Sequence, residues 1–174
     1  MDILAHMLWA NYGAQAGNIK LKKEKKPLIN LTWVTFWSVF PDLFAFAIPM
    51  VIAIPAIIMN GFNLTRPDMF GLPATLYQYS HSLVLWAIIF IFVWILAKRP
   101  RLELLGWLLH ILIDIPSHSA TFYPTPFLFP ISEYRFKDGI SWSNTTFMII
   151  NYSLLLIVSL YIFRKNKKAR LLHK

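Results

Sequence analysis

The chain has 174 residues, of which 57% are hydrophobic and only 14% are charged. A water-soluble domain of this length needs more charged surface, so the composition excludes an ordinary soluble protein and predicts one membrane-embedded domain over residues 1–174. The net charge of +9 does not indicate nucleic-acid binding, because most Lys and Arg residues lie in three clusters that border apolar runs, at residues 20–26, 98–101 and 164–174.

Residues 1–17 predict a helix that is packed against the bundle or inserted into it. The apolar residues of this segment are interrupted by His6, Asn11 and Gln15, which makes it too polar for an independent span. It has no basic residue before its first apolar stretch, since the first Lys is Lys20, so a cleaved signal peptide is not expected. Residues 20–26 follow with five lysines and predict a cytoplasmic loop.

Four apolar stretches predict four transmembrane helices, and therefore an all-α, polytopic membrane helix bundle. They cover residues 31–59, 74–97, 102–115 and 145–163. The first stretch contains Pro41, Pro49 and Pro55, at which breaks or kinks are expected. The loop of residues 60–71 is predicted to face outside.

The remaining segments complete the predicted topology. Residues 119–143, rich in Pro and aromatic residues, form an external loop segment that is too long for a plain turn and is a candidate lid or interfacial cap. Residues 164–174 form a basic cytoplasmic tail. This topology places fourteen of the 17 Lys and Arg residues on the cytoplasmic side, as the positive-inside rule requires.

Six ionisable residues lie in the predicted helices, where each charge costs about 2.5–3.5 kcal/mol and is therefore a functional candidate. They are His6, Asp42, His81, His110, Asp114 and His118. The spacing His110-x3-Asp114-x3-His118 places three of them on one helix face. Counting ~1.5 Å per residue places His6, Asp42, His81 and Asp114 roughly 18–20 Å above the inner boundary of the membrane.

Imidazole and carboxylate groups at one depth predict a divalent-metal site that uses all six residues. Because the chain has no cysteine, thiolate ligands are excluded; zinc is the first expectation, and manganese and iron also suit these donors. Asp42, Asp114 and His118 are the candidate catalytic residues, the aspartates orienting an activated water and His118 carrying protons. The open alternative is a set of separate polar residues that hydrogen-bond between helices.

Polar residues beside these six are candidates to orient the ligands, since metal-bound histidines usually donate their second nitrogen to such groups. The candidates are Asn11, Gln15, Tyr79, Ser80, Ser82, Ser117 and Ser119. Each has a commoner role in helix packing or capping.

These motifs resemble a known family. The strings YSHSL at residues 79–83 and GWLLHILID at residues 106–114 are similar to the membrane-bound metal-dependent hydrolases, which include the LexA-binding, inner-membrane-associated hydrolases. The order of His6, the Pro-Asp pair at Asp42, His81 and the His-x3-Asp helix matches that family, and FKDGISW at residues 136–142 resembles a further stretch of some members. A more distant resemblance is to zinc-dependent phospholipase C.

The resemblance spans roughly residues 3–142 and departs from the family pattern at two places. Some relatives have acidic or histidine residues where this chain has Leu43, Phe44 and Ala45, and a second histidine where it has Leu76. The resemblance therefore implies one or two metal ions rather than a larger cluster.

The resemblance implies a metal-dependent hydrolase of a phosphoester or lipid in the bacterial inner membrane, with membrane lipids as its surroundings and no nucleic-acid partner. Two other functions stay open from the residues alone. The same His and Asp residues suit a small transporter of protons, ions or metal, and the basic tail of residues 164–174 suits a non-catalytic membrane scaffold.

Overall fold

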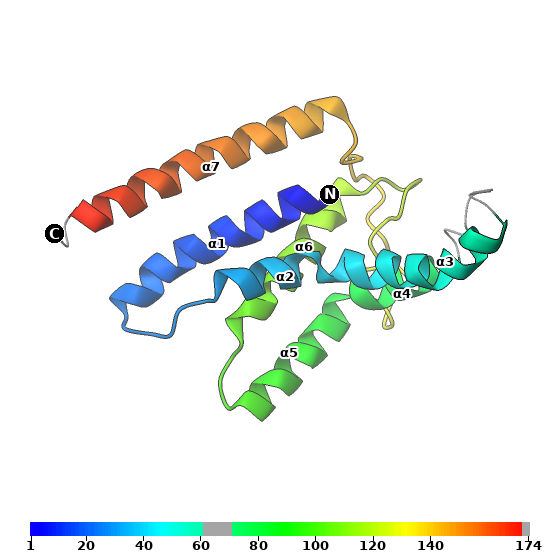
Figure 1. Cartoon of the computed structure of the whole chain (residues 1–174), viewed down its shortest axis with the longest axis horizontal. Coiled ribbons are helices and arrows are strands. Elements are labelled where there is room, and N and C mark those ends of the chain that lie inside the picture. Colours follow the sequence, from blue (N-terminus) through cyan, green and yellow to red (C-terminus); the bar gives the residue numbers. More distant parts are fainter. Residues whose placement is uncertain (61–70, 172–174) are drawn as a thin grey trace.

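The computed structural model describes residues 1–60 and 71–171, and that part of the chain contains helices and no strand (Figure 1). The helices are α1 (Ile3–Lys23), α2 (Leu31–Asp42), α3 (Ile48–Asn60), α4 (Leu72–Ser80), α5 (Leu83–Ala97), α6 (Leu105–Ser117) and α7 (Thr145–Leu171). A π-helical turn, Leu43–Ala47, joins α2 to α3, and a 3₁₀ turn, Leu102–Leu104, precedes α6. The predicted all-α class is confirmed. Most of the predicted outer loop, residues 61–70, lies outside the described residues.

Among the described residues, two helices are long and apolar enough to cross a membrane. One is the continuous stretch Leu31–Pro55, which runs through α2 and α3, and the other is Thr145–Lys167 in α7. A third span results if α4 and α5, bent by 57° at their junction, are counted together. Four predicted spans are therefore not confirmed, because α6 has 13 residues and a span needs about 20.

The predicted continuous helix over residues 74–97 is broken at His81 and Ser82. The Ser82 hydroxyl caps α5 by accepting from the Leu85 N–H at 3.1 Å, and it donates to the Phe129 carbonyl. The Leu83 N–H donates to the Phe127 carbonyl at 2.9 Å. The external segment thus satisfies backbone and side-chain groups that a break within a membrane would leave unpaired.

The helix over α2 and α3 continues through the three prolines at which breaks are predicted. Pro49 lies in the first turn of α3 and Pro55 lies inside that helix. Only Pro41 is followed by a change of geometry, the π-helical turn that begins directly after Asp42. Such turns widen a helix locally and occur often at functional sites.

The centre of the bundle is formed by α6, which packs against α2 and α1, while α7 covers the other side of α1 (Figure 1). Gly106 allows the close approach of α6 to α2, because a Cβ there would overlap the Val34 carbonyl oxygen. The Trp9 indole donates to Asn151 at 2.9 Å and so joins α1 to α7. The predicted packing of the first helix against the bundle is confirmed. This helix extends to Lys23, so only part of residues 20–26 is loop.

Residues 119–143 contain neither helix nor strand and pack against the end of α6. The Ile140 N–H donates to the Pro116 carbonyl and the Trp142 N–H donates to the Ser117 carbonyl, both at 2.9 Å. The predicted last helix, residues 145–163, continues to Leu171, so most of the predicted tail is helical.

Candidate metal centre

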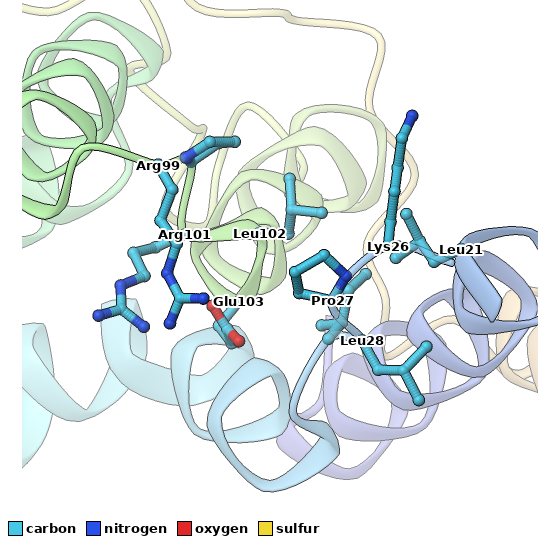
Figure 2. Close-up of a pocket in the computed structure, with 10 residues that line it drawn as sticks. Leu21, Lys26, Pro27, Leu28, Arg99, Arg101, Leu102 and Glu103 are labelled. Atoms are coloured by element: carbon cyan, nitrogen blue, oxygen red, sulfur yellow. The ribbon is translucent and has the colours of Figure 1, made fainter. Parts of the chain in front are cut away.

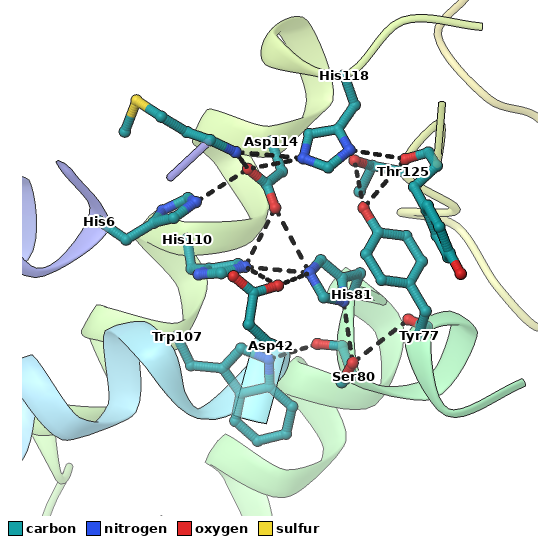
Figure 3. Close-up of polar contacts among 12 residues, drawn as sticks. His6, Asp42, Tyr77, Ser80, His81, Trp107, His110, Asp114, His118 and Thr125 are labelled. Atoms are coloured by element: carbon teal, nitrogen blue, oxygen red, sulfur yellow. Dashed lines mark hydrogen bonds and ion pairs between the residues drawn. The ribbon is translucent and has the colours of Figure 1, made fainter. Parts of the chain in front are cut away.

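Four of the six predicted ligands meet in one group (Figure 3). Asp42 comes from the end of α2, His81 from the bend between α4 and α5, and His110 and Asp114 from successive turns of α6. One ligand atom from each residue lies within 4.8 Å of the ligand atoms of the other three. His81, His110 and Asp114 are buried, and the Asp42 side chain is 17% exposed. A group of this composition could hold a metal ion.

The distances within this group suit a common ion. Asp114 Oδ2 lies 3.1 Å from His110 Nε2 and 3.4 Å from His81 Nε2. Asp42 Oδ1 lies 3.5 Å from His81 Nε2 and 3.7 Å from His110 Nε2. Two atoms that each lie ~2.0–2.1 Å from one tetrahedral ion are roughly 3.3–3.4 Å apart. The histidine–carboxylate distances therefore lie close to coordination spacing.

A backbone carbonyl fixes the tautomer of His110, and a serine contacts the outer ring nitrogen of His81. His110 Nδ1 lies 2.7 Å from the Ser38 carbonyl oxygen, which can only accept, so Nδ1 is the protonated nitrogen of a neutral His110. Ser80 Oγ lies 3.4 Å from the Tyr77 carbonyl oxygen and 2.9 Å from His81 Nδ1, and it accepts from Nδ1 in the tautomer of His81 that can bind a metal. In that tautomer the two Nε2 atoms, 3.0 Å apart, both direct lone pairs at the centre of the group, which is the arrangement of metal-bound histidine. In the other tautomer of His81, its Nε2–H donates to His110 Nε2.

Asp114 Oδ2 has no hydrogen-bond partner among the described residues, although two ring nitrogens lie within 3.4 Å. A buried carboxylate oxygen without a partner costs free energy, and in the metal-binding tautomers the Nε2 lone pairs that face it add repulsion. A cation at the centre of the group removes both costs. The residues present therefore fit a divalent ion.

The other two predicted ligands, His6 and His118, lie on the opposite oxygen of the same carboxylate (Figure 3). Asp114 Oδ1 is 3.0 Å from His6 Nε2 and 3.4 Å from His118 Nε2, and it also contacts the amino group of Met1. His6 stacks on the His110 ring, with centroids 3.8 Å apart, and neither of its nitrogens has a hydrogen-bond partner among the described residues. The six predicted residues thus form one cluster. His81 and His110 lie near Oδ2 of Asp114, whereas His6 and His118 lie near Oδ1.

The residues predicted to orient the ligands are only partly found at the site. Ser80 is found there, and Ser117 Oγ lies 3.5 Å from Asp114 Oδ1. The others have different contacts: Asn11 with Gln15 and Thr35, Tyr79 with Phe129, Ser82 with α5 and Phe129, and Ser119 with Thr121. Closeness in sequence to a candidate ligand therefore does not by itself predict that a residue orients that ligand.

Three groups that contact the histidines or their neighbours are not predicted from the sequence. Tyr77 stacks on His81 with ring centroids 3.7 Å apart and places its hydroxyl 3.3 Å from Thr125 Oγ1. The Trp107 indole donates to the Ser80 carbonyl at 2.7 Å, and the Ser38 carbonyl accepts from His110. Tyr77 lies one helical turn before His81, so its spacing was an available signal, whereas a backbone carbonyl leaves no mark in a sequence.

A cavity of about 770 Å³ reaches the metal centre at Asp42 and the opposite half of the cluster at His118. Its walls come from the start of α1, the π-helical turn, α3 and the external segment. Most of the lining is apolar, and Leu4, Met50 and Phe122 at its walls are 54%, 61% and 43% exposed. The site therefore communicates with an apolar surface.

No protein-family model, no curated protein and no solved structure matches the chain. The resemblance to the membrane-bound metal-dependent hydrolases stays a prediction from the motifs.

Proposed function

We propose that this protein is a membrane-embedded, metal-dependent hydrolase that acts on a lipid with a phosphoester or other ester bond. Its ion is held by Asp42, His81, His110 and Asp114. One observation carries the proposal: two histidine Nε2 atoms and two carboxylates, from three separate segments, face a common point at coordination spacing. Nitrogen and oxygen donors in a set of four favour zinc.

When bound, a divalent ion supplies Lewis-acid activation of water and of an ester oxygen. The chain's own residues supply the proton chemistry. Asp42 is the partly exposed carboxylate on the cavity wall and is placed to accept a proton from water. His118 lines the same cavity, where it is placed to return a proton to the leaving group. Asp114 holds the two halves of the cluster together.

The shape and chemistry of the cavity support an amphiphilic substrate. Its lining is mainly apolar, and Asp42, His118, Tyr123 and the first residues of the chain contribute polar groups. An acyl chain could lie along the apolar walls while the ester bond reaches the metal centre. In this proposal the protein resides in a bacterial inner membrane with its basic tail in the cytoplasm, where the positive-inside rule places it.

Metal analysis of the purified protein tests the site directly. The wild-type protein is expected to carry about one zinc or other divalent ion per chain, because four donors already stand at coordination spacing. His110→Ala and Asp114→Asn should reduce the metal content by at least tenfold. The matched controls are Asp138→Asn in the external segment and His173→Ala in the tail. Both variants should keep the metal content of the wild type. Metal-free wild-type protein, or equal loss in the controls, would overturn the proposal.

The same samples separate the possible reactions. Hydrolysis of a phospholipid panel by wild type, but not by His110→Ala, supports the hydrolase. Metal uptake into proteoliposomes without hydrolysis of any lipid or phosphoester supports the transporter instead. A content of two ions per chain, one of them lost with His6→Ala, would place a second ion on Asp114 Oδ1.

A further inference from the structure

Two loops that are distant in sequence form a second, basic pocket away from the metal centre (Figure 2). One is the loop between α1 and α2, and the other is the loop between α5 and α6. The pocket has a volume of about 230 Å³. The Asn30 N–H donates to Glu103 Oε1 at 3.3 Å and so connects the two loops at its edge.

The position of this pocket is set by the candidate spans. The span Leu31–Pro55 begins next to it, and the bent pair of α4 and α5 ends next to it at Ala97. The ends of spans lie at the level of the lipid phosphates. The pocket is also lined by Leu28, which is 54% exposed, and by Leu102. Its surroundings therefore combine charge with apolar surface, as at a membrane boundary.

The charges that line the pocket are not all available to a ligand. Lys26 pairs with Glu24 at 2.7 Å, and Figure 2 shows its ammonium across the pocket from the arginines. Arg99 and Arg101 are exposed, and neither forms an ion pair with any residue that the structure describes. Two unpaired guanidinium groups on one loop suit a phosphate, which arginine binds through paired hydrogen bonds.

The size of the pocket limits the ligand. Sites for whole small molecules usually measure ~300–1,000 Å³, so a cavity of about 230 Å³ suits a single polar group whose remainder lies outside. A phospholipid meets this condition, because its phosphate is compact and its acyl chains extend into the bilayer beside the spans.

We propose that Arg99 and Arg101 bind the phosphate headgroup of one anionic phospholipid and thereby hold the α1–α2 and α5–α6 loops at the membrane surface. This site is separate from the proposed metal centre and does not depend on hydrolysis.

Lipid retention in native mass spectrometry tests this proposal. The full-length protein is reconstituted in phosphatidylcholine bilayers that contain phosphatidylglycerol, and lipids that stay bound after release are counted. Wild type should retain one phosphatidylglycerol. The double variant Arg99→Gln/Arg101→Gln should bind it roughly 30-fold more weakly, because two cationic contacts are lost. The matched control Arg164→Gln/Lys165→Gln loses the same charge from α7 and should retain the lipid.

Further arms distinguish the alternatives. Equal weakening in both double variants would show general attraction to basic surface and would overturn a specific site, as would a wild type that retains no lipid. Inorganic phosphate added to pure phosphatidylcholine samples should not raise the midpoint of thermal unfolding, whereas phosphatidylglycerol should. Equal stabilisation by inorganic phosphate would overturn the lipid as ligand. Unchanged unfolding midpoints of both variants in pure phosphatidylcholine verify that they fold.

Discussion

Asp114 shows how one side chain organises the site. Its Oδ2 faces His81 and His110, and its Oδ1 faces His6 and His118. The carboxylate is buried and contacts residues from α1, from the bend between α4 and α5, and from α6. Asp114→Asn therefore replaces a charged ligand at the centre of the cluster with a neutral amide, which binds a divalent ion more weakly.

Ser80, which contacts His81, allows a test of how the ligands are oriented. Ser80→Ala removes the oxygen that lies 2.9 Å from His81 Nδ1 and leaves the ring free to change its tautomer. We expect metal affinity to fall by about 10–100-fold, the usual effect of removing an orienting partner. Metal titration of the metal-depleted protein measures it. Ser153→Ala, an exposed serine on α7, is the control, and equal affinities of the two variants would contradict the assigned role.

At the residue scale the sequence predicted the members of the site better than their arrangement. Helical spacing placed His110 and Asp114 on one face, and counting from helix ends placed Asp42 and His81 at the same depth; these four residues do meet. The division of the cluster between two oxygens of Asp114 was not predictable, because it depends on the direction of side chains from separate helices.

Among the elements, the contact between α2 and α6 fixes Asp42 relative to His110. Gly106 lies in this contact, and an added Cβ would overlap the Val34 carbonyl oxygen. Gly106→Ala is therefore expected to destabilise the fold by about 1–3 kcal/mol through overpacking. Thermal unfolding in detergent micelles measures the change.

A second glycine serves as the matched control for this substitution. A Cβ at Gly13 in α1 would meet no atom within 4 Å. Gly13→Ala should therefore raise stability by about 0.5–1 kcal/mol, from the helix propensity of alanine alone. If Gly106→Ala behaved like Gly13→Ala, the close packing of α2 on α6 would be wrong.

The break between α4 and α5 is the element that sequence reasoning missed. The run of residues 74–97 is long and apolar enough for one span, and the polar groups of Ser80, His81 and Ser82 suit a metal site as well as they suit a helix end. Ser82 is in fact the cap of α5. The carbonyls that stabilise the break belong to Phe127 and Phe129, and no local pattern reveals such remote partners.

On the scale of the whole molecule, the charge clusters predict which ends of the helices face the cytoplasm. The chain has no cysteine, so single cysteines can be labelled without background. Lys137→Cys in the external segment should react with a membrane-impermeant maleimide in spheroplasts. Lys23→Cys at the end of α1 should react only after permeabilisation, since the basic clusters stay inside. The reverse pattern would refute the predicted topology.

The all-helical class is confirmed, whereas the four predicted spans are not confirmed. Hydropathy identified the helical, membrane-associated character because it integrates over many residues. It also predicted a full span at residues 102–115, whereas α6 is a short helix at the centre of the bundle. Its buried ligands and Gly106 make it an internal element, and the length of an apolar run does not distinguish such a helix from a spanning one.

The hydrogen bond from the Leu83 N–H to the Phe127 carbonyl has a consequence for biogenesis. A ribosome completes Leu83 long before Phe127, so a bend at this position lacks its final partner for this N–H when α5 first enters the bilayer. An unpaired amide there costs several kcal/mol, and the bend cannot settle until the later segment arrives. His81 is synthesised before His110 and Asp114, yet on this view it is the last of the three to take its final position.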